Sequence, residues 1–236
     1  MLILGIETAT AQVGCAVGGH EGVLASTHSA RAKRHAESLA PAIDFTCRQA
    51  RVALSEISVV AVDHGPGLFT GLRVGVASAK AFAQGLAVPV IGVSSLDLLA
   101  FPVRFSNRLI VTVIDARRGE LFYAFYRQVP GGVQRLGVHH VGTPRDLASE
   151  LVARGEECLL VGDGALRYAE DFLGDDRVEL AETGFAYPSA TSLVQLAHAR
   201  ALREDWVKPW ELRPLYLRKP DAEINWTQRD RPERVV

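Results

Sequence analysis

The chain has 236 residues, a net charge of −1, 48% apolar residues and 22% charged residues. This composition is typical of a globular protein, and the near-zero net charge excludes a general electrostatic attraction to nucleic acid or to an anionic membrane. No apolar run reaches the length of a membrane span, and the apolar start has no basic leader. The three cysteines, Cys15, Cys47 and Cys158, are far apart, which argues against a disulfide framework and leads us to expect a cytoplasmic protein.

The first part of the chain begins with strands and then alternates between helices and strands. Apolar residues at helical spacing predict a helix over residues 36–53, although Pro41 leaves its start open. The other elements expected here are strands over residues 2–10, 11–19, 22–30, 57–62 and 88–95, a helix over residues 70–87 and a short helix over residues 96–100.

The second part repeats the same order of elements. Thr143 is the expected N-cap of a helix over residues 143–154, with Pro144 at its first position. The remaining elements expected are strands over residues 107–119, 120–128, 131–141, 157–165 and 177–181 and helices over residues 166–173 and 192–203. The sequence therefore predicts an α/β protein of two tandem halves, residues 1–104 and 105–218, with mixed sheets covered by helices and a tail over residues 219–236.

This order of elements resembles the actin-like ATPase superfamily, also called the ASKHA or RNase H-like fold. The resemblance implies that a nucleotide would lie between the halves, with phosphates at the strand turns and adenosine at a glycine-rich strand end. The weak candidates for an ATP or ADP site are Thr8, Thr10, Asp115, Gly162 and Gly164. Two plainer alternatives stay open: the glycines form an ordinary turn, and Asp115 with its neighbouring arginines forms a solvated strand end.

The stretch HGPGLFTGLRVG, residues 64–75, is a glycine-rich turn between an expected strand and an expected helix. It lacks the lysine and hydroxyl residue that follow the last glycine of a P-loop, and it lacks the third glycine of the dinucleotide-binding fingerprint. From its pattern alone, the stretch is a tight turn with Thr70 capping the next helix.

Six segments resemble the bacterial TsaB family, in the family's order and over nearly the whole chain. They read LGIETAT, RHAESLAPAI, GPGLFTGLRVG, AKAFAQGLAVPVIGVSSLDLLA, DARRGELFYAFY and RPLYLRKP. The resemblance implies a role in making threonylcarbamoyladenosine at position 37 of tRNA. It implies a non-catalytic scaffold that pairs with the transferase TsaD and, with it, the ATPase TsaE, so that tRNA is met only through the complex. Alone, such a protein can pair with itself.

The related transferase TsaD carries two metal-binding histidines four residues apart, a spacing that puts both on one helix face. Ser95 and Leu99 stand at the matching positions. We therefore expect no catalytic metal, and the missing histidines argue against a third interpretation, a metalloprotease. The main alternative to a scaffold is an actin-like ATPase or kinase that uses the space between the halves.

The helices of the first half carry the predicted partner interface. Gly71, Gly75 and Ala79 are four residues apart and form a flat strip, which favours close approach of another helix. An equally weighted alternative is that the strip packs against the chain's own sheet. Phe45 falls partly outside the apolar face of the first helix, which suggests a second contact. The predicted interface residues are Leu39, Ile43, Cys47, Gly71, Leu72, Gly75 and Ala79.

Overall fold

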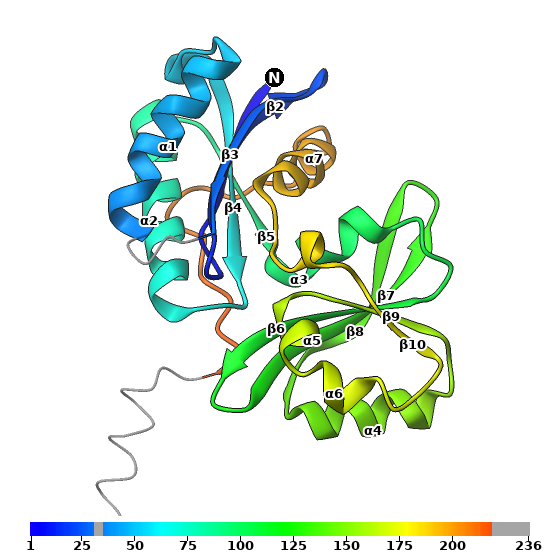
Figure 1. Cartoon of the computed structure of the whole chain (residues 1–236). Coiled ribbons are helices and arrows are strands. Elements are labelled where there is room, and N and C mark those ends of the chain that lie inside the picture. The colour runs from blue at the N-terminus through cyan, green and yellow to red at the C-terminus, as the bar shows by residue number, and fades with distance from the viewer. Residues whose placement is uncertain (31–34, 219–236) are drawn as a thin grey trace, which may run out of the picture.

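The computed structural model describes residues 1–30 and 35–218, and it contains two five-stranded sheets with helices packed on them (Figure 1). The first half consists of β1 (Leu2–Glu7), β2 (Val13–Gly19), β3 (Gly22–Ser29), α1 (His35–Ala50), the 3-10 turn η1 (Leu54–Glu56), β4 (Ile57–Gly65), α2 (Phe69–Leu86), β5 (Val90–Ser94) and α3 (Ser95–Ala100).

The second half follows the 3-10 turn η2 (Phe101–Val103) and repeats this order. It consists of β6 (Leu109–Arg117), β7 (Glu120–Val129), β8 (Gly132–Gly142), α4 (Pro144–Arg154), β9 (Cys158–Val161), α5 (Asp163–Arg167), α6 (Ala169–Phe172), β10 (Val178–Leu180), the 3-10 turn η3 (Thr183–Phe185) and α7 (Ala190–Ala201).

The strand order is the same in both sheets. The first sheet runs β3-β2-β1-β4-β5, and the second runs β8-β7-β6-β9-β10. In each sheet the first three strands are antiparallel and the last two lie parallel to the first. The predicted α/β fold with two tandem actin-like halves and mixed sheets is therefore confirmed.

Helices cover both faces of the first sheet because its strands are apolar on both faces. Leu4 and Ile6 of β1 pack with the core side of α1 and α2, whereas Ile3 packs with α7 on the opposite face. Helix α3 sits between the two sheets: Leu98 packs on the first, and Leu99 packs on the second. In the described residues, no helix combines the length and the apolar character needed to cross a membrane.

The predicted boundary between the halves needs one correction. Helix α7 was assigned to the second half, but it packs on β1 and β2 of the first sheet. After α7 the chain stays with the first half, where Val207 forms a short antiparallel bridge with Val90 and Leu212 enters the core. The apolar face of the first sheet explains this, because without α7 it would be exposed to water.

Single elements also differ from the expectation. Thr143 caps α4 as predicted, and its hydroxyl accepts a hydrogen bond from the Asp146 amide. The helix predicted over residues 166–173 is instead two short helices, α5 and α6, separated at Tyr168. Helix α2 begins after Leu68 and not at Thr70. The predicted tail, residues 219–236, lies outside the described residues.

Candidate functional site

Two carboxylates lie side by side at the carboxyl ends of β1 and β4. The strands are parallel and Ile6 pairs with Val62, so the residues that follow, Glu7 and Asp63, lie at the same height in the sheet. Both side chains are fully buried. Burying two neighbouring charges without a counter-ion is unfavourable, so burial disfavours the form in which both acids are ionised.

Each carboxylate has one oxygen that is bonded and one that is not. Glu7 Oε1 accepts from the Ala9 amide at 2.8 Å, while Asp63 Oδ1 accepts from the Gly65 amide at 2.9 Å and from Ser95 Oγ at 2.6 Å. Glu7 Oε2 and Asp63 Oδ2 are buried without a hydrogen-bond partner among the described residues. Neither oxygen has a partner that would offset the cost of burying a charge, so burial favours the protonated form of these acids.

The pKa values of the two acids agree with this preference for the protonated form. Burial, and then the charge of Asp63, raises the pKa of Glu7 well above its ordinary value. Burial raises the pKa of Asp63 to about 7, although the hydrogen bonds from Ser95 and Gly65 act to lower it. The pair therefore carries fewer than two charges near neutral pH. Sequence reasoning did not identify this pair, because Glu7 and Asp63 lie far apart in the chain.

Ser95 and Leu99 are both occupied within the fold. Ser95 is fully buried and donates its hydroxyl to Asp63, as described above. Leu99 is buried in the core between α3 and the second sheet. Among the described residues, no group of three or more His, Cys, Asp or Glu side chains is placed to hold a metal ion.

The glycine-rich turn packs against the first turn of the chain. A Cβ added at Gly67 would overlap the Ala9 carbonyl oxygen, and one added at Gly71 would overlap the Thr8 carbonyl oxygen. At Gly75 it would overlap the Thr8 hydroxyl, which itself donates to the Gly71 carbonyl at 2.8 Å. The glycines therefore allow the start of α2 to approach the β1–β2 turn, and here the alternative of packing within the chain is correct.

The predicted partner interface is therefore corrected. All seven of its residues are buried inside the first half, because they form the sides of α1 and α2 that face the chain's own sheet. They are Leu39, Ile43, Cys47, Gly71, Leu72, Gly75 and Ala79. Phe45 was predicted to fall outside that face, and its 48% exposure confirms this.

The nucleotide candidates of the first half serve local structure. Thr8 is fully buried and holds α2 through its hydroxyl. The Thr10 carbonyl oxygen lies 2.9 Å from His35 Nε2, which joins the β1–β2 turn to the start of α1. Both side chains are thus part of the packing between this turn and the helices.

The candidates of the second half lie at the equivalent strand ends. Asp115 ends in a buried carboxylate whose Oδ2 is 3.0 Å from Arg117 and 3.5 Å from Arg167. Its amide donates to Asp163 Oδ1 at 3.1 Å. Burial raises the pKa of Asp163 to about 6, against the effect of that hydrogen bond. This strand end is buried and ion-paired, so the expectation that its charges are solvated is wrong for Asp115.

Gly162 and Gly164 allow α5 to lie close to β6. A Cβ at Gly162 would overlap the Val113 carbonyl oxygen, and one at Gly164 would crowd the Asp115 amide at 2.9 Å. Gly162 also has a φ of 120°, a backbone conformation that side chains disfavour. The chain's own packing thus accounts for both glycines.

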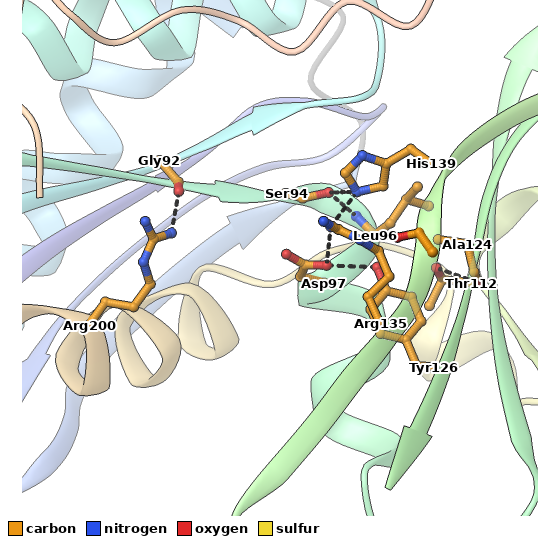
Figure 2. Close-up of polar contacts among 11 residues, drawn as sticks. Gly92, Ser94, Leu96, Asp97, Thr112, Ala124, Tyr126, Arg135, His139 and Arg200 are labelled. Atoms are coloured by element: carbon orange, nitrogen blue, oxygen red, sulfur yellow. Dashed lines mark hydrogen bonds and ion pairs between the residues drawn. The ribbon is translucent and has the colours of Figure 1, made fainter. Parts of the chain in front are cut away.

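A polar network around the start of α3 joins the two halves (Figure 2). His139 Nε2 on β8 lies 3.2 Å from Ser94 Oγ and 2.7 Å from Arg135 Nη1. Arg135 also pairs with Asp97 of α3 at 3.2 Å, and Asp97 accepts from the Tyr126 hydroxyl at 2.7 Å. The network therefore fixes the end of β5 and the start of α3 against β7 and β8.

The protonation state of His139 follows from this network. A guanidinium always donates, so the imidazole nitrogen facing Arg135 must accept. Burial, and then the charge of Arg135, lowers the pKa of His139. His140, its neighbour on the strand, points to the opposite face and stacks on Tyr123 at 5.0 Å. The two histidines diverge because successive side chains of a strand point to opposite faces.

The chain after α7 runs past the glycine-rich turn as a C-terminal strap, residues 211–218 (Figure 1). Leu215 donates its amide to the His64 carbonyl at 2.7 Å, and the Tyr216 ring lies 5.3 Å from that of Phe69. The next residues reach the second half: Arg218 pairs with Glu120 at 2.6 Å. The strap thus bridges β4 and α2 of one half to β7 of the other.

Comparison with known proteins places this geometry in a family. The model of the TsaD family, described as tRNA N6-adenosine threonylcarbamoyltransferase, matches residues 23–226. The tRNA threonylcarbamoyladenosine biosynthesis protein TsaB of Bacillus subtilis is 29% identical over 97% of this chain and 99% of its own length. The chain belongs to this family, on its TsaB branch.

A solved structure and a further relative are also similar to the chain. The solved structure titled YeaZ from Pseudomonas aeruginosa has a TM-score of 0.81 and 27% identity, over 92% of this chain and 99% of that one. An uncharacterized protein of Mycobacterium leprae is 37% identical over 94% of this chain. This TsaB-family chain spans 56% of the Mycobacterium leprae protein, so that relative is considerably longer.

Proposed function

We propose that this TsaB-family chain is a non-catalytic scaffold of the cytoplasmic machinery that makes threonylcarbamoyladenosine at position 37 of tRNA. It pairs with a TsaD transferase and, with it, a TsaE ATPase, and it meets tRNA only through that complex. The TsaB name of relatives that align over almost their whole length supports the pathway. A homodimer forms when TsaD is absent.

The contacts of Ser95 and Leu99 support the proposal that the chain is non-catalytic. In the transferase pattern these positions supply imidazole ligands, but here a hydroxyl is committed to Asp63 and a leucine fills the core. Neither side chain offers the nitrogen that a shared metal ion requires. The glycines near the proposed nucleotide positions are likewise explained by close packing of the backbone. These observations favour a scaffold over an actin-like ATPase or kinase.

The outer faces of α1 and α2 are the surface that we propose for TsaD. The helices lie side by side on one face of the first sheet (Figure 1). Phe45 of α1 is 48% exposed, and Pro41 beside it is exposed as well. On α2, Ala77 and Ala81 are exposed and present a smooth face one turn long. An exposed aromatic ring on one helix and exposed small residues on the other fit a helix-packing partner better than they fit water.

The proposal is tested by pairing with TsaD. We expect Phe45→Glu to abolish co-elution with TsaD in size-exclusion chromatography while the thermal unfolding midpoint of the isolated chain stays close to that of the wild type. Phe105→Glu is the matched control because Phe105 is another exposed phenylalanine, 72% accessible, in the linker between the halves. If Phe45→Glu still pairs as tightly as Phe105→Glu, the α1–α2 surface is not the TsaD contact.

A further inference from the structure

A pocket of about 380 Å³ lies between the linker that follows α3 and the segment that leads into α7. This volume is within the range of about 300–1,000 Å³ that is usual for small-molecule sites. Its lining combines aromatic, cationic and uncharged polar side chains, among them Phe101, Arg104, Phe185, Tyr187, Thr191 and Gln195. None of the nucleotide candidates at the strand ends lines it.

Flat side chains dominate the rim of the pocket. The Arg104 guanidinium lies over two rings, 4.2 Å from the centre of Phe101 and 4.3 Å from that of Phe105, and it donates to the Phe101 carbonyl at 2.9 Å. Phe185, which lines the pocket, is 38% exposed, and Phe105, which touches Arg104 but lies outside the lining, is 72% exposed. The exposed Phe185 ring, with the Arg104–Phe101 stack beside it, favours a planar aromatic ligand that stacks on the ring.

Three polar side chains in the pocket have no hydrogen-bond partner among the described residues: Tyr187, Thr191 and Gln195. Thr191 and Gln195 are four residues apart on α7, so they share one helix face. The neighbouring hydroxyls differ, because Ser189 caps the helix and bonds to Ser192. A ligand in the pocket therefore meets a free amide with one donor side and one acceptor side.

We propose that this pocket binds an adenine base. The stacking surfaces accept any base and favour a large purine, and the Gln195 amide can bond to both N6 and N7 of adenine. Arg104 is the one cationic side chain of the lining and already bonds a carbonyl oxygen, so the pocket recognises the base and not a phosphate. The proposal goes beyond the scaffold function and does not depend on it.

The test uses the purified full chain and two probes that share the base: adenosine and a short single-stranded oligoadenylate RNA. Isothermal titration should show binding of adenosine and much weaker binding of uridine. Gln195→Ala should weaken adenosine binding by at least about fivefold, the lower end of what a bidentate base contact contributes. Phe185→Ala should weaken it by a similar factor through lost stacking. Gln84→Ala, an exposed glutamine on α2, should change nothing.

The probes separate the two sources of the base. Tighter binding of the RNA than of adenosine, still sensitive to Gln195→Ala, identifies an RNA strand as the ligand; equal binding identifies a free nucleoside or nucleotide. Unfolding midpoints of all variants should match the wild type, because Gln195 and Phe185 are partly or fully exposed. The proposal is overturned if adenosine and the RNA both fail to bind, or if binding is unchanged in Gln195→Ala and Phe185→Ala. Loss of TsaD pairing in the Phe45→Glu test leaves this result unaffected.

Discussion

The two halves of the molecule end equivalent strands on acids, but they stabilise those acids differently. In the first half, Glu7 and Asp63 are buried with two orphaned oxygens and no cation, so they retain a proton. In the second half, Asp115 is buried as an ion pair with Arg117 and Arg167. The same topology thus holds protonated acids in one half and an ion-paired acid in the other, and the strand order alone does not reveal which case applies to a given half.

In both halves, glycines allow a helix to pack closely on the end of a strand. Disrupting this packing should cause the largest change in the free energy of unfolding. Gly71→Ala places a methyl group against the Thr8 carbonyl oxygen, and we expect it to lower the free energy of unfolding by about 1–3 kcal/mol. Gly85→Ala on the same helix meets nothing within 4 Å, so it should raise the free energy of unfolding by up to about 1 kcal/mol. Urea denaturation measures both, and equal effects would show that the start of α2 does not pack closely on the β1–β2 turn.

The carboxyl pair should make stability depend on pH. Its pKa values are raised in the folded state, so its contribution is present at low pH and is lost as pH rises from the unfolded pKa through the folded pKa near 7. Asp63→Asn removes the titration of Asp63, leaves the burial of Glu7 in place, and keeps an acceptor for Ser95. We expect the variant to gain about 1–3 kcal/mol relative to the wild type between about pH 5.5 and about pH 8.

Two histidines have the opposite effect on the pH dependence of stability. The effect of the acid pair must therefore be measured as a difference between the wild type and a variant. Burial lowers the pKa of His64 and of His139, so their contribution is lost as pH falls. They are unchanged in Asp63→Asn, and the difference between the two proteins therefore isolates the acid pair. Asp44→Asn, in an exposed pair with Arg48, is the control. A pH-independent difference for Asp63→Asn would mean that Asp63 does not titrate with a raised pKa in the folded protein.

The ion pairs of the second half should give the smallest effect. Arg117 and Arg167 are about half exposed, so Arg117→Ala should cost about 0.5–1 kcal/mol and Arg167→Ala should cost less. The double substitution should cost more than the sum because Asp115 is then buried without a cation. Both effects should shrink at about 0.5 M salt. Arg48→Ala in the exposed pair with Asp44 is the matched control, and an equal loss there would show that burial of Asp115 adds nothing.

The repeat of elements was visible in the sequence because helices and strands differ in apolar period. Two predictions from the sequence were wrong, and each has a physical cause. Helix α7 follows the second half in the chain, and only the apolar outer face of the first sheet reveals where it packs. The strip of Gly71, Gly75 and Ala79 has the same spacing whether it meets a partner or the chain's own turn, and only the position of Thr8 decides.

The candidate site was harder to predict than the fold. Glu7 and Asp63 are far apart in the chain, and their pairing depends on the parallel register of β1 and β4. The network around His139 depends on contacts between the halves, and the spacing of apolar residues in the sequence does not predict such contacts. The pocket beside α7 is built from the linker and the segment before α7, neither of which carries a recognisable motif.

The scaffold proposal is tested most directly by reconstituting threonylcarbamoyl transfer to tRNA from purified TsaD, TsaE and this chain. We expect no transfer by this chain alone, full transfer by the mixture, and a loss with Phe45→Glu that higher protein concentration restores, because the variant weakens assembly only. Thr8→Ser, Thr10→Ala and Asp115→Asn, if folded, should leave the rate within about twofold of the wild type. A strand-end variant that abolishes transfer while the complex still forms would contradict the scaffold account.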